Sequence, residues 1–515
     1  MVEATEPSRV AGRREWVALG VLTLAVVLLA VDGTVLALAV PALTADLNPS
    51  ATQLLWIGDI YSFALAGLLV TMGNLADRIG RKRLLLIGTV GFGLASVLAA
   101  FAPSAELLIA ARVLLGVSGA TLMPSTLSII RNMFEVPAQR TRAIAIWSAG
   151  ATGGAALGPL VGGALLEQFW WGSVFLINVP VMVVLLIAGA LLLPESRNPN
   201  SGPIDLLSAA LSVATILPVV YAVKHTVSAG FELQGAGAAL IGLAAGVGFV
   251  RRQRRLTYPL VDVSLFRMPA FAGAVSANTI SIFAFSGLLF FFSQYLQLVR
   301  GFSPLRAGIA ELPSTIAAIG VIFFVGAMIT RLGRGPAIGA GLLVAALGLV
   351  LLAVAEGLPT YLWIAVAIAV IGLGVGVSMT LATDAVVDAV PRERAGAAAS
   401  ISETGYELGI ALGIAVLGSV QTLFYRLQLT VPGDVSQGDR EAVTESLASA
   451  TRVLADRGPE AMALLEQARH AFTGGMQVTA LIAAALTLLA GVIAWRVVPP
   501  VGKRQVQPAD LRKKK

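Results

Sequence analysis

Five acidic residues of this 515-residue chain lie inside long apolar segments, where ionisable side chains are rare. They are Asp32, Asp59, Glu311, Glu403 and Glu407. A carboxylate in an apolar environment is destabilised unless it is paired, hydrated or protonated. Acids in such positions are therefore candidates for binding cations and for carrying protons.

Proton transfer is the first chemistry that these residues suggest. Glu403 and Glu407 are four residues apart, so on a helix they share one face, where burial and mutual repulsion favour a proton on the pair. Arg112 also interrupts an apolar segment, at about the depth of Asp32, and its guanidinium requires a polar partner there. A purely structural ion pair is the alternative for Arg112. The expected proton-coupling residues are Asp32, Arg112, Glu403 and Glu407.

Binding of organic cations is the second chemistry. Several acids with few compensating bases suit a positively charged, partly hydrophobic ligand, and aromatic faces attract such cations as well. Asp59 could instead cap a helix end, and more than half of the aromatic residues could simply pack or face lipid. No metal site is expected, because the chain has no cysteine and only two histidines. The expected substrate-binding residues are Asp32, Asp59, Tyr61, Glu311, Phe285, Tyr406 and Glu407.

The elements that carry these residues are predicted to be membrane-spanning helices. The chain is 57% hydrophobic and 13% charged, about half the ~25% charge of a soluble domain, and a bilayer core takes ~20 apolar residues per helix. We therefore expect an all-α polytopic membrane protein. Fourteen apolar segments lie at roughly 16–40, 52–76, 84–102, 105–130, 143–168, 172–193, 205–224, 234–250, 270–297, 305–330, 335–355, 359–383, 395–423 and 471–495.

Charge distribution predicts the topology of these spans. With fourteen spans both termini lie on one side, and 27 of the 36 Lys and Arg residues fall in segments on that side. The excess of Lys and Arg marks the cytoplasmic side. We therefore expect a multi-pass protein of a bacterial inner membrane with both termini cytoplasmic. The net charge of +7 then reflects contact with the lipid bilayer and needs no nucleic-acid partner, and a monomer is expected.

A repeat divides the chain into two halves. Residues 73–81 and 326–334 carry glycines and arginines at the same spacing, 253 residues apart, with Thr330 where the first copy has Asp77. Related halves that rock about a central site are the usual architecture of transporters. The charged residues of the first copy are expected to form a gating latch between the halves, and a basic cluster that only sets topology is the alternative. The latch residues are Gly73, Asp77, Arg78, Gly80, Arg81 and Arg83.

The predicted domain organisation follows from the repeat. Residues 1–15 form a cytoplasmic tail, 16–194 the first six-helix bundle, and 195–255 an inserted pair of helices. The second bundle consists of five helices in 256–424 and a last helix in 471–496, followed by a basic tail at 497–515. The connecting segment 425–470 has apolar residues at helical spacing around Gly458-Pro459 and is expected to be an extracellular helical hairpin, with a flexible loop as the alternative.

Several motifs resemble those of a known family. The segment from Gly73 to Arg83 matches the cytoplasmic loop signature of the major facilitator superfamily, and Arg112-Val-Leu-Leu-Gly116 is similar to the motif whose arginine that family assigns to proton coupling. Small residues at four-residue spacing between 150 and 163 resemble its antiporter motif, a smooth face for close helix packing. Asp32-Gly-Thr-Val and the segment 402–409 point more narrowly to the fourteen-span drug:proton antiporters of the QacA, LfrA and SmvA type. The antiporter-motif residues are Gly150, Gly154, Gly158, Pro159, Gly162 and Gly163.

The resemblance implies a major facilitator fold and a function. The chain is expected to export cationic, lipophilic drugs, such as quaternary ammonium compounds, dyes, antiseptics or antibiotics, in exchange for protons and without a cofactor. Export of an endogenous lipid, siderophore or secondary metabolite, or facilitated or symport movement of another solute, remains the alternative. An ATP-driven pump is excluded because the only Gly-Lys pair, at 502–503, is followed by Arg504. No nucleophile–base pair or metal cluster indicates an enzyme.

Overall fold

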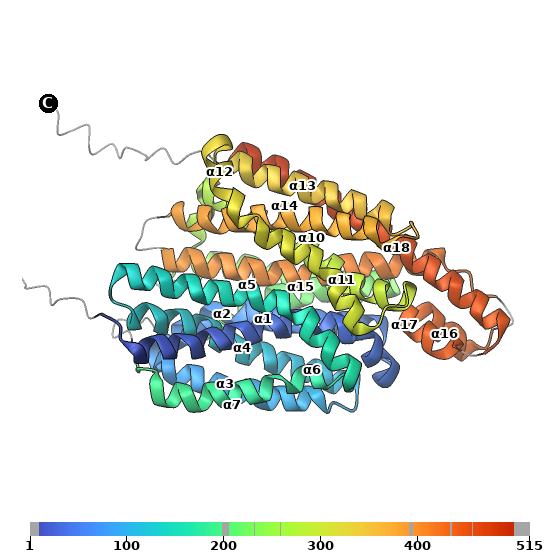
Figure 1. Cartoon of the computed structure of the whole chain (residues 1–515), viewed down its shortest axis with the longest axis horizontal. Coiled ribbons are helices and arrows are strands. Elements are labelled where there is room, and N and C mark those ends of the chain that lie inside the picture. The colour runs from blue at the N-terminus through green and yellow to red at the C-terminus, as the bar shows by residue number, and fades with distance from the viewer. Residues whose placement is uncertain are drawn as a thin grey trace, which may run out of the picture. The chain divides into compact units, whose positions relative to one another are not determined.

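The structure, a computed structural model, describes residues 10–197, 205–230, 232–257, 259–390, 395–432, 435–455 and 457–498. These residues form helices joined by short connections, with no strand among them (Figure 1). Within them, thirteen helical segments are long and apolar enough to cross a membrane, and α5 is a fourteenth if its two bent parts count as one span. The prediction of an all-α protein with about fourteen apolar spans is confirmed.

The helices of the first 260 residues follow the predicted spans closely. They are α1 (Arg13–Leu47), α2 (Ala51–Ile79), α3 (Arg81–Ala100), α4 (Ala105–Met133), α5 (Pro137–Gln168), α6 (Ser173–Leu176), α7 (Asn178–Leu192), α8 (Leu206–Ala229) and α9 (Leu233–Gln253). The remaining elements are η1 (Val263–Arg267), α10 (Pro269–Gln294), η2 (Tyr295–Val299), α11 (Pro304–Gly320), α12 (Ile322–Leu332), α13 (Arg334–Ala355), α14 (Tyr361–Asp388), α15 (Ala395–Gln428), α16 (Gln437–Glu445), α17 (Leu447–Leu454) and α18 (Pro459–Val497).

Two compact units make up the chain. Unit 1 contains residues 1–261, 286–312 and 407–479, and unit 2 contains 262–285, 313–406 and 480–515. The division therefore does not follow the predicted boundary between the halves. Parts of α10, α11, α15 and α18 belong to unit 1. Phe290 of α10 and Ile414 of α15 approach Gly58 of α2, and Leu305 of α11 approaches Gly163 of α5. The first part of α18 contacts α15, where the Gln421 side chain donates to the Phe472 carbonyl oxygen. In unit 2 the closest pairing is between α13 and α14, where Gly341 and Gly374 allow backbone contact.

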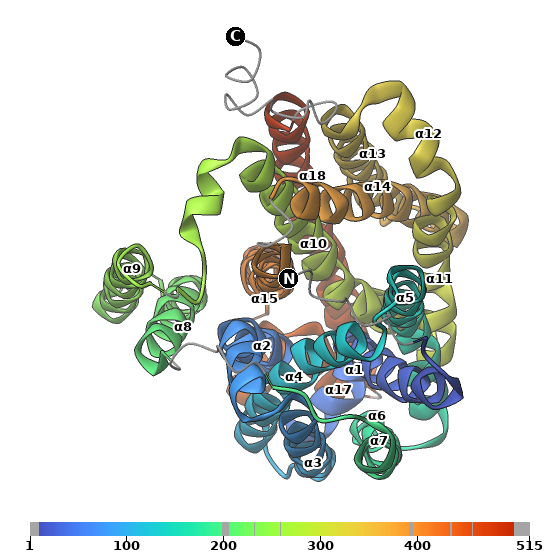
Figure 2. The same ribbon diagram turned by 90° about the vertical axis from the view of Figure 1, so that its left-hand side faces the viewer.

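Close pairs of helices build unit 1. α1 packs on α5, α2 on α4, α3 on α4 and α7, and α8 on α9, and the α3–α7 and α8–α9 pairs are visible in the end-on view (Figure 2). α5 bends by 42° between Ala155 and Leu157. Pro159 explains the bend, because it lacks the N–H that would bond to the Ala155 carbonyl and its ring clashes with that carbonyl.

Short helices cover the end of unit 1 at which α1 ends and α2 begins, which we call the distal end. The Tyr425 hydroxyl donates to the Val443 carbonyl oxygen at 2.7 Å, and the Arg452 guanidinium donates to the Asn48 side-chain oxygen at 2.5 Å. The Glu445 carboxylate accepts from the Ala51 backbone N–H. The first contact ties α16 to α15, and the other two tie α17 and α16 to the turn between α1 and α2.

The expected hairpin in 425–470 has only part of its predicted form. α16 and α17 are separate short helices, but the segment after Gly458 is the first part of α18, which runs without a break to Val497. The helix that carries the last predicted span therefore begins at Pro459, before the predicted start of that span at residue 471. The helical spacing of apolar residues continues from the polar first part of α18 into its apolar second part. Hydropathy alone therefore does not show where the helix begins.

Candidate substrate and proton site

A buried network centred on Asp32 links four helices of unit 1. Arg112 of α4 forms an ion pair with one carboxylate oxygen of Asp32 at 3.2 Å. The Asn178 side-chain amide of α7 donates to the other oxygen at 2.8 Å and to the Ser96 hydroxyl of α3 at 3.1 Å. Asp32 is 1% exposed and Arg112 2% exposed. Each buried charge is thus compensated by a specific partner of opposite charge, as buried charges require.

Glycine positions Arg112 beside α2. A Cβ at Gly116, one turn after Arg112, would lie 2.5 Å from the Tyr61 carbonyl oxygen, so only glycine permits this approach of α4 to α2. The Arg112 Nε then donates to the Ile57 carbonyl oxygen at 3.2 Å. Its guanidinium lies 4.7 Å from the centre of the Tyr61 ring, within the range of a cation–π contact.

Asp59 takes part in a second buried ion pair. The Lys224 ammonium of α8 lies 2.7 Å from one Asp59 carboxylate oxygen and donates to the other at 3.0 Å. It also lies 3.7 Å from the centre of the Trp56 ring. Asp59 is fully buried and Lys224 is 2% exposed. A cation from the inserted helices therefore compensates Asp59, which the sequence analysis expected to bind substrate or to cap a helix end.

Hydrophobic contacts bring α8 into this position. Val220 of α8 packs with Phe63 of α2 and with Ala411 and Ala415 of α15 in one buried cluster, and Trp56 packs against the same cluster. The inserted helix thus contacts both the first half and α15, the helix that carries Glu407. Asp205 fixes the other end of α8, since it accepts hydrogen bonds from the Ser208 backbone N–H and the Arg252 guanidinium.

The other predicted site residues are divided between the two units. Glu311 and Glu407 belong to unit 1, where each is 6% exposed, and one Glu311 carboxylate oxygen accepts no hydrogen bond from the described residues. Glu407 lies one helical turn before Ala411, which packs in the same buried cluster as Phe63 of α2. The half-buried Phe285, Glu403 and Tyr406 belong to unit 2.

The glycines of α5 lie against α1. A Cβ at Gly154 would lie 2.5 Å from the Val27 carbonyl oxygen, and Cβ atoms at Gly150, Gly158 and Gly162 would meet the side chains of Thr23, Thr34 and Val35 at 2.4 Å or less. Gly163 faces α11 instead, where a Cβ would lie 2.7 Å from the Leu305 Cα, and Gly308 approaches the Pro159 carbonyl oxygen. These residues let α5 pack backbone to backbone on two neighbours.

The predicted latch residues form contacts inside unit 1. Asp77 and Arg81 form an ion pair at 2.7 Å, and Gly80 adopts φ +115°, a conformation that favours glycine. The Glu195 carboxylate accepts from the backbone N–H groups of Lys82 and Arg83 at 3.2 and 3.1 Å, and so caps the start of α3. Glu195, which follows α7, contacts the segment of the predicted latch and is not among the predicted latch residues.

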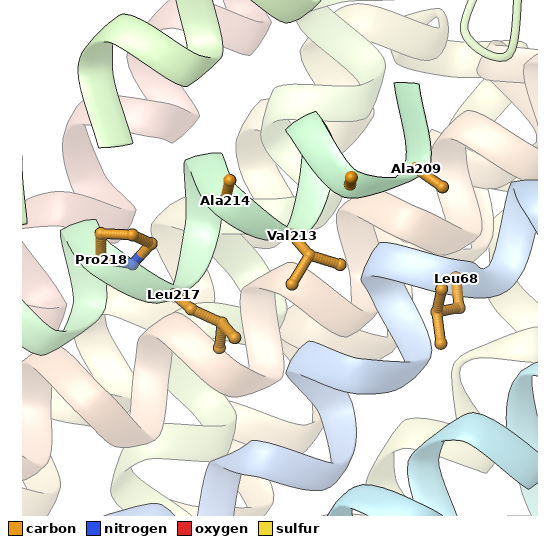
Figure 3. Close-up of a pocket in the computed structure, with 7 residues that line it drawn as sticks. Leu68, Ala209, Val213, Ala214, Leu217 and Pro218 are labelled. Atoms are coloured by element: carbon orange, nitrogen blue, oxygen red, sulfur yellow. The ribbon is translucent and has the colours of Figure 1, made fainter. Parts of the chain in front are cut away.

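An apolar groove of about 460 Å³ lies between α2 and α8. Figure 3 shows its side chains from both helices. No charged or polar residue lines it, so it offers no site for a cation. The lining residues are Leu68, Ala209, Ala210, Val213, Ala214, Leu217 and Pro218.

Three partners in these networks escaped the sequence analysis. Lys224 is the last residue of the predicted span 205–224, and α8 continues past it to Ala229. Asn178 lies 146 residues from Asp32 in the sequence. Its polar side chain within an apolar segment was the available signal. Glu195 carried none, because acids are common where a span ends.

The helical spans and the buried charge networks define a multi-pass membrane transporter. The chain belongs to the major facilitator superfamily, whose family model matches residues 22–414.

Comparison with known proteins gives a narrower group of relatives. The chain is 47% identical to the multidrug efflux pump LfrA of Mycolicibacterium smegmatis, covering 96% of this chain and 98% of LfrA. It is 36% identical to the methyl viologen resistance protein SmvA of Salmonella typhimurium, covering 94% and 98%. Among solved structures, it resembles an inward-facing bacterial homologue of the lysosomal transporter Spinster, with a TM-score of 0.65, 21% identity and coverage of 94% and 98%. That likeness supports the fold alone.

Proposed function

We propose that the protein exports cationic, lipophilic compounds in exchange for protons. The observation that carries the proposal is the buried ion pair of Asp32 and Arg112, completed by Asn178. A carboxylate with this degree of burial binds either a cation or a proton, and a proton removes its attraction for a positive charge. Relatives named for multidrug efflux and methyl viologen resistance support the substrate class.

Coupling follows from competition for the buried acids. When a proton neutralises Asp32, the Arg112 guanidinium loses its ionic partner, although its bond to the Ile57 carbonyl and its contact with Tyr61 can remain. The freed positive charge opposes a cationic substrate near Tyr61 and Glu407. Protonation therefore promotes release of the substrate, and loss of the proton restores the ion pair for the next cycle.

Transport in proteoliposomes tests this proposal. Ethidium should move against its gradient when a proton gradient is imposed, and a protonophore should abolish the movement. Asp32→Asn should abolish uphill transport, whereas Asp46→Asn, in an exposed position on the same helix, should retain it. Uphill transport by a well-folded Asp32→Asn variant at the wild-type rate would refute the role of Asp32. Uphill transport that persists with the protonophore would refute proton coupling.

We also propose that both termini are cytoplasmic in a bacterial inner membrane. The proposal rests on the excess of Lys and Arg in the segments on the side of the termini. Reporter fusions test it, with a fluorescent protein at the C-terminus and alkaline phosphatase inserted in the segment between α16 and α18. A fluorescent C-terminal fusion and an active phosphatase fusion are expected. A non-fluorescent C-terminus together with an inactive phosphatase would show that the topology is the reverse of the proposed one.

A further inference from the structure

Lys224, Asp59 and Trp56 form an arrangement that has the chemistry of a cation-binding site. A buried carboxylate neutralises the ammonium, and an indole ring lies across from it at 3.7 Å from its centre. A carboxylate beside an aromatic face binds organic ammonium groups in general, because the ring quadrupole and the negative charge attract the same cation. The side chain of Lys224 is thus a cation that is covalently tethered inside this site.

We propose that Asp59 and Trp56 form a substrate subsite for organic cations, that Lys224 occupies it in the substrate-free protein, and that a cationic substrate displaces Lys224. This inference rests on the proposed function and specifies how one of its acids binds substrate. Exchange of one cation for another leaves the charge of Asp59 compensated throughout, so it avoids the cost of an unpaired buried carboxylate.

The position of Lys224 provides a place for the displaced ammonium. Lys224 lies five residues before the end of α8 at Ala229, which is roughly 7.5 Å along the helix. Lysine has a flexible four-carbon stem and commonly extends its charge toward a membrane interface from such positions. The ammonium can therefore leave Asp59 for the distal interface without remaining buried and unpaired.

The surroundings connect this subsite to the rest of unit 1. Trp56 and Val220, one turn before Lys224, belong to the contacts that join α2, α8 and α15. α15 carries Glu407 one turn before Ala411 of this cluster, and the Ile57 carbonyl oxygen of α2 accepts a hydrogen bond from Arg112. Displacement of Lys224 would therefore alter contacts among the helices that also hold the Asp32 network. This gives the inserted helix α8 a role in substrate recognition in addition to packing.

Lysine labelling can test displacement in the unaltered protein. The chain has six lysines, and Lys224 is the only one between Lys82 and Lys503. Purified full-length protein is treated with an acetylating N-hydroxysuccinimide ester with and without ethidium, and the acetylation rate of each lysine is measured by mass spectrometry. Ethidium should raise the rate at Lys224 several-fold. Lys82, which donates to the Ala190 carbonyl oxygen at 2.7 Å, is the internal control and should not change.

Substitution of the tethered cation gives an independent test. Lys224→Met keeps the length and apolar stem of the side chain and removes the ammonium, so ethidium should bind the vacated subsite about tenfold more tightly, a change of ~1.4 kcal/mol. The double variant Lys224→Met with Asp59→Asn should lose that gain. If Lys224 only anchors α8, Lys224→Met lowers thermal stability and leaves ethidium affinity at the wild-type value.

The outcomes separate this inference from the proposed function. If wild-type protein binds ethidium but the labelling of Lys224 does not change, displacement is refuted. An unchanged affinity of a folded Lys224→Met variant refutes the subsite. If wild-type protein and all variants fail to bind ethidium and other organic cations, the proposed substrate class fails as well. Labelling needs no variant, so it decides the question even if Lys224→Met does not fold.

Discussion

Gly154→Ala should disrupt the contact between α1 and α5 and slow transport. A Cβ at residue 154 would lie 2.5 Å from the Val27 carbonyl oxygen and 2.9 Å from the Val27 Cα. Ordinary contact begins near 3.4 Å, so α1 must move away by roughly 1 Å because backbone atoms cannot rotate aside. Overpacking of this kind costs ~1–3 kcal/mol. The movement also acts on Asp32, which lies five residues further along α1.

The neighbouring Gly153 supplies a matched control. A Cβ at residue 153 meets no atom within 4 Å outside its own helix. Gly153→Ala should therefore leave stability unchanged or raise it slightly, because alanine favours the helix by up to ~1 kcal/mol over glycine. The two variants differ by one position and share the same added methyl group, so any difference between them reports the contact with α1.

Two measurements on the same preparations decide the outcome. The temperature at which half of the protein remains monodisperse after heating should fall by a few degrees in Gly154→Ala, on the order of 2 °C for each kcal/mol. Proton-driven ethidium transport in proteoliposomes should fall as well. If Gly154→Ala behaves like Gly153→Ala in both assays, the backbone contact between α1 and α5 is not as close as described, and its role in positioning Asp32 is refuted.

Three further substitutions test other contacts. Asn178→Ala leaves Asp32 with one fewer hydrogen bond in a buried site, so the free energy of unfolding should fall by ~1–3 kcal/mol and uphill transport should slow. Wild-type values of both quantities in the variant would contradict the network. Glu195→Gln weakens the cap of α3 and should lower the melting temperature by the equivalent of ~1 kcal/mol, with no change expected in ethidium affinity. The Arg252 hydrogen bond lowers the pKa of Asp205 to about 2, so the carboxylate stabilises the fold above its ordinary pKa near 4 and loses this effect as the pH falls toward 2. Asp205→Asn should therefore destabilise the protein by ~1 kcal/mol at pH 7 and by less at pH 3, and an equal loss at both values would exclude the ion pair as the cause.

The periodic and compositional features of the sequence predicted the spans well. Apolar length sets where a helix can cross a membrane, and this information is local in the chain. The acids at Asp32 and Asp59 were also recognisable, because a charge in an apolar segment stands out against its neighbours. What each acid binds was not readable, because the partner of Asp59 lies 165 residues away.

Segments at the ends of spans were the hardest to predict. Lys224 closes an apolar segment, and the same residue type is common in exposed loops, so only the packing of α8 on α2 and α15 reveals that it is buried. The predicted last span at 471–496 lies within α18, which begins earlier, at Pro459. A helix that extends beyond the membrane keeps its hydrogen bonds while its composition changes from apolar to polar, so composition does not show where it begins.

The close contact of α1 with α5 has a mechanical consequence. Where backbones touch across successive turns, few long side chains separate the helices, so sliding or tilting one against the other would produce collisions at every glycine. The two helices must therefore move as one rigid pair during transport, and hinge or shear motion has to occur at interfaces with longer side chains. A short covalent cross-link between α1 and α5 would leave such a transporter active.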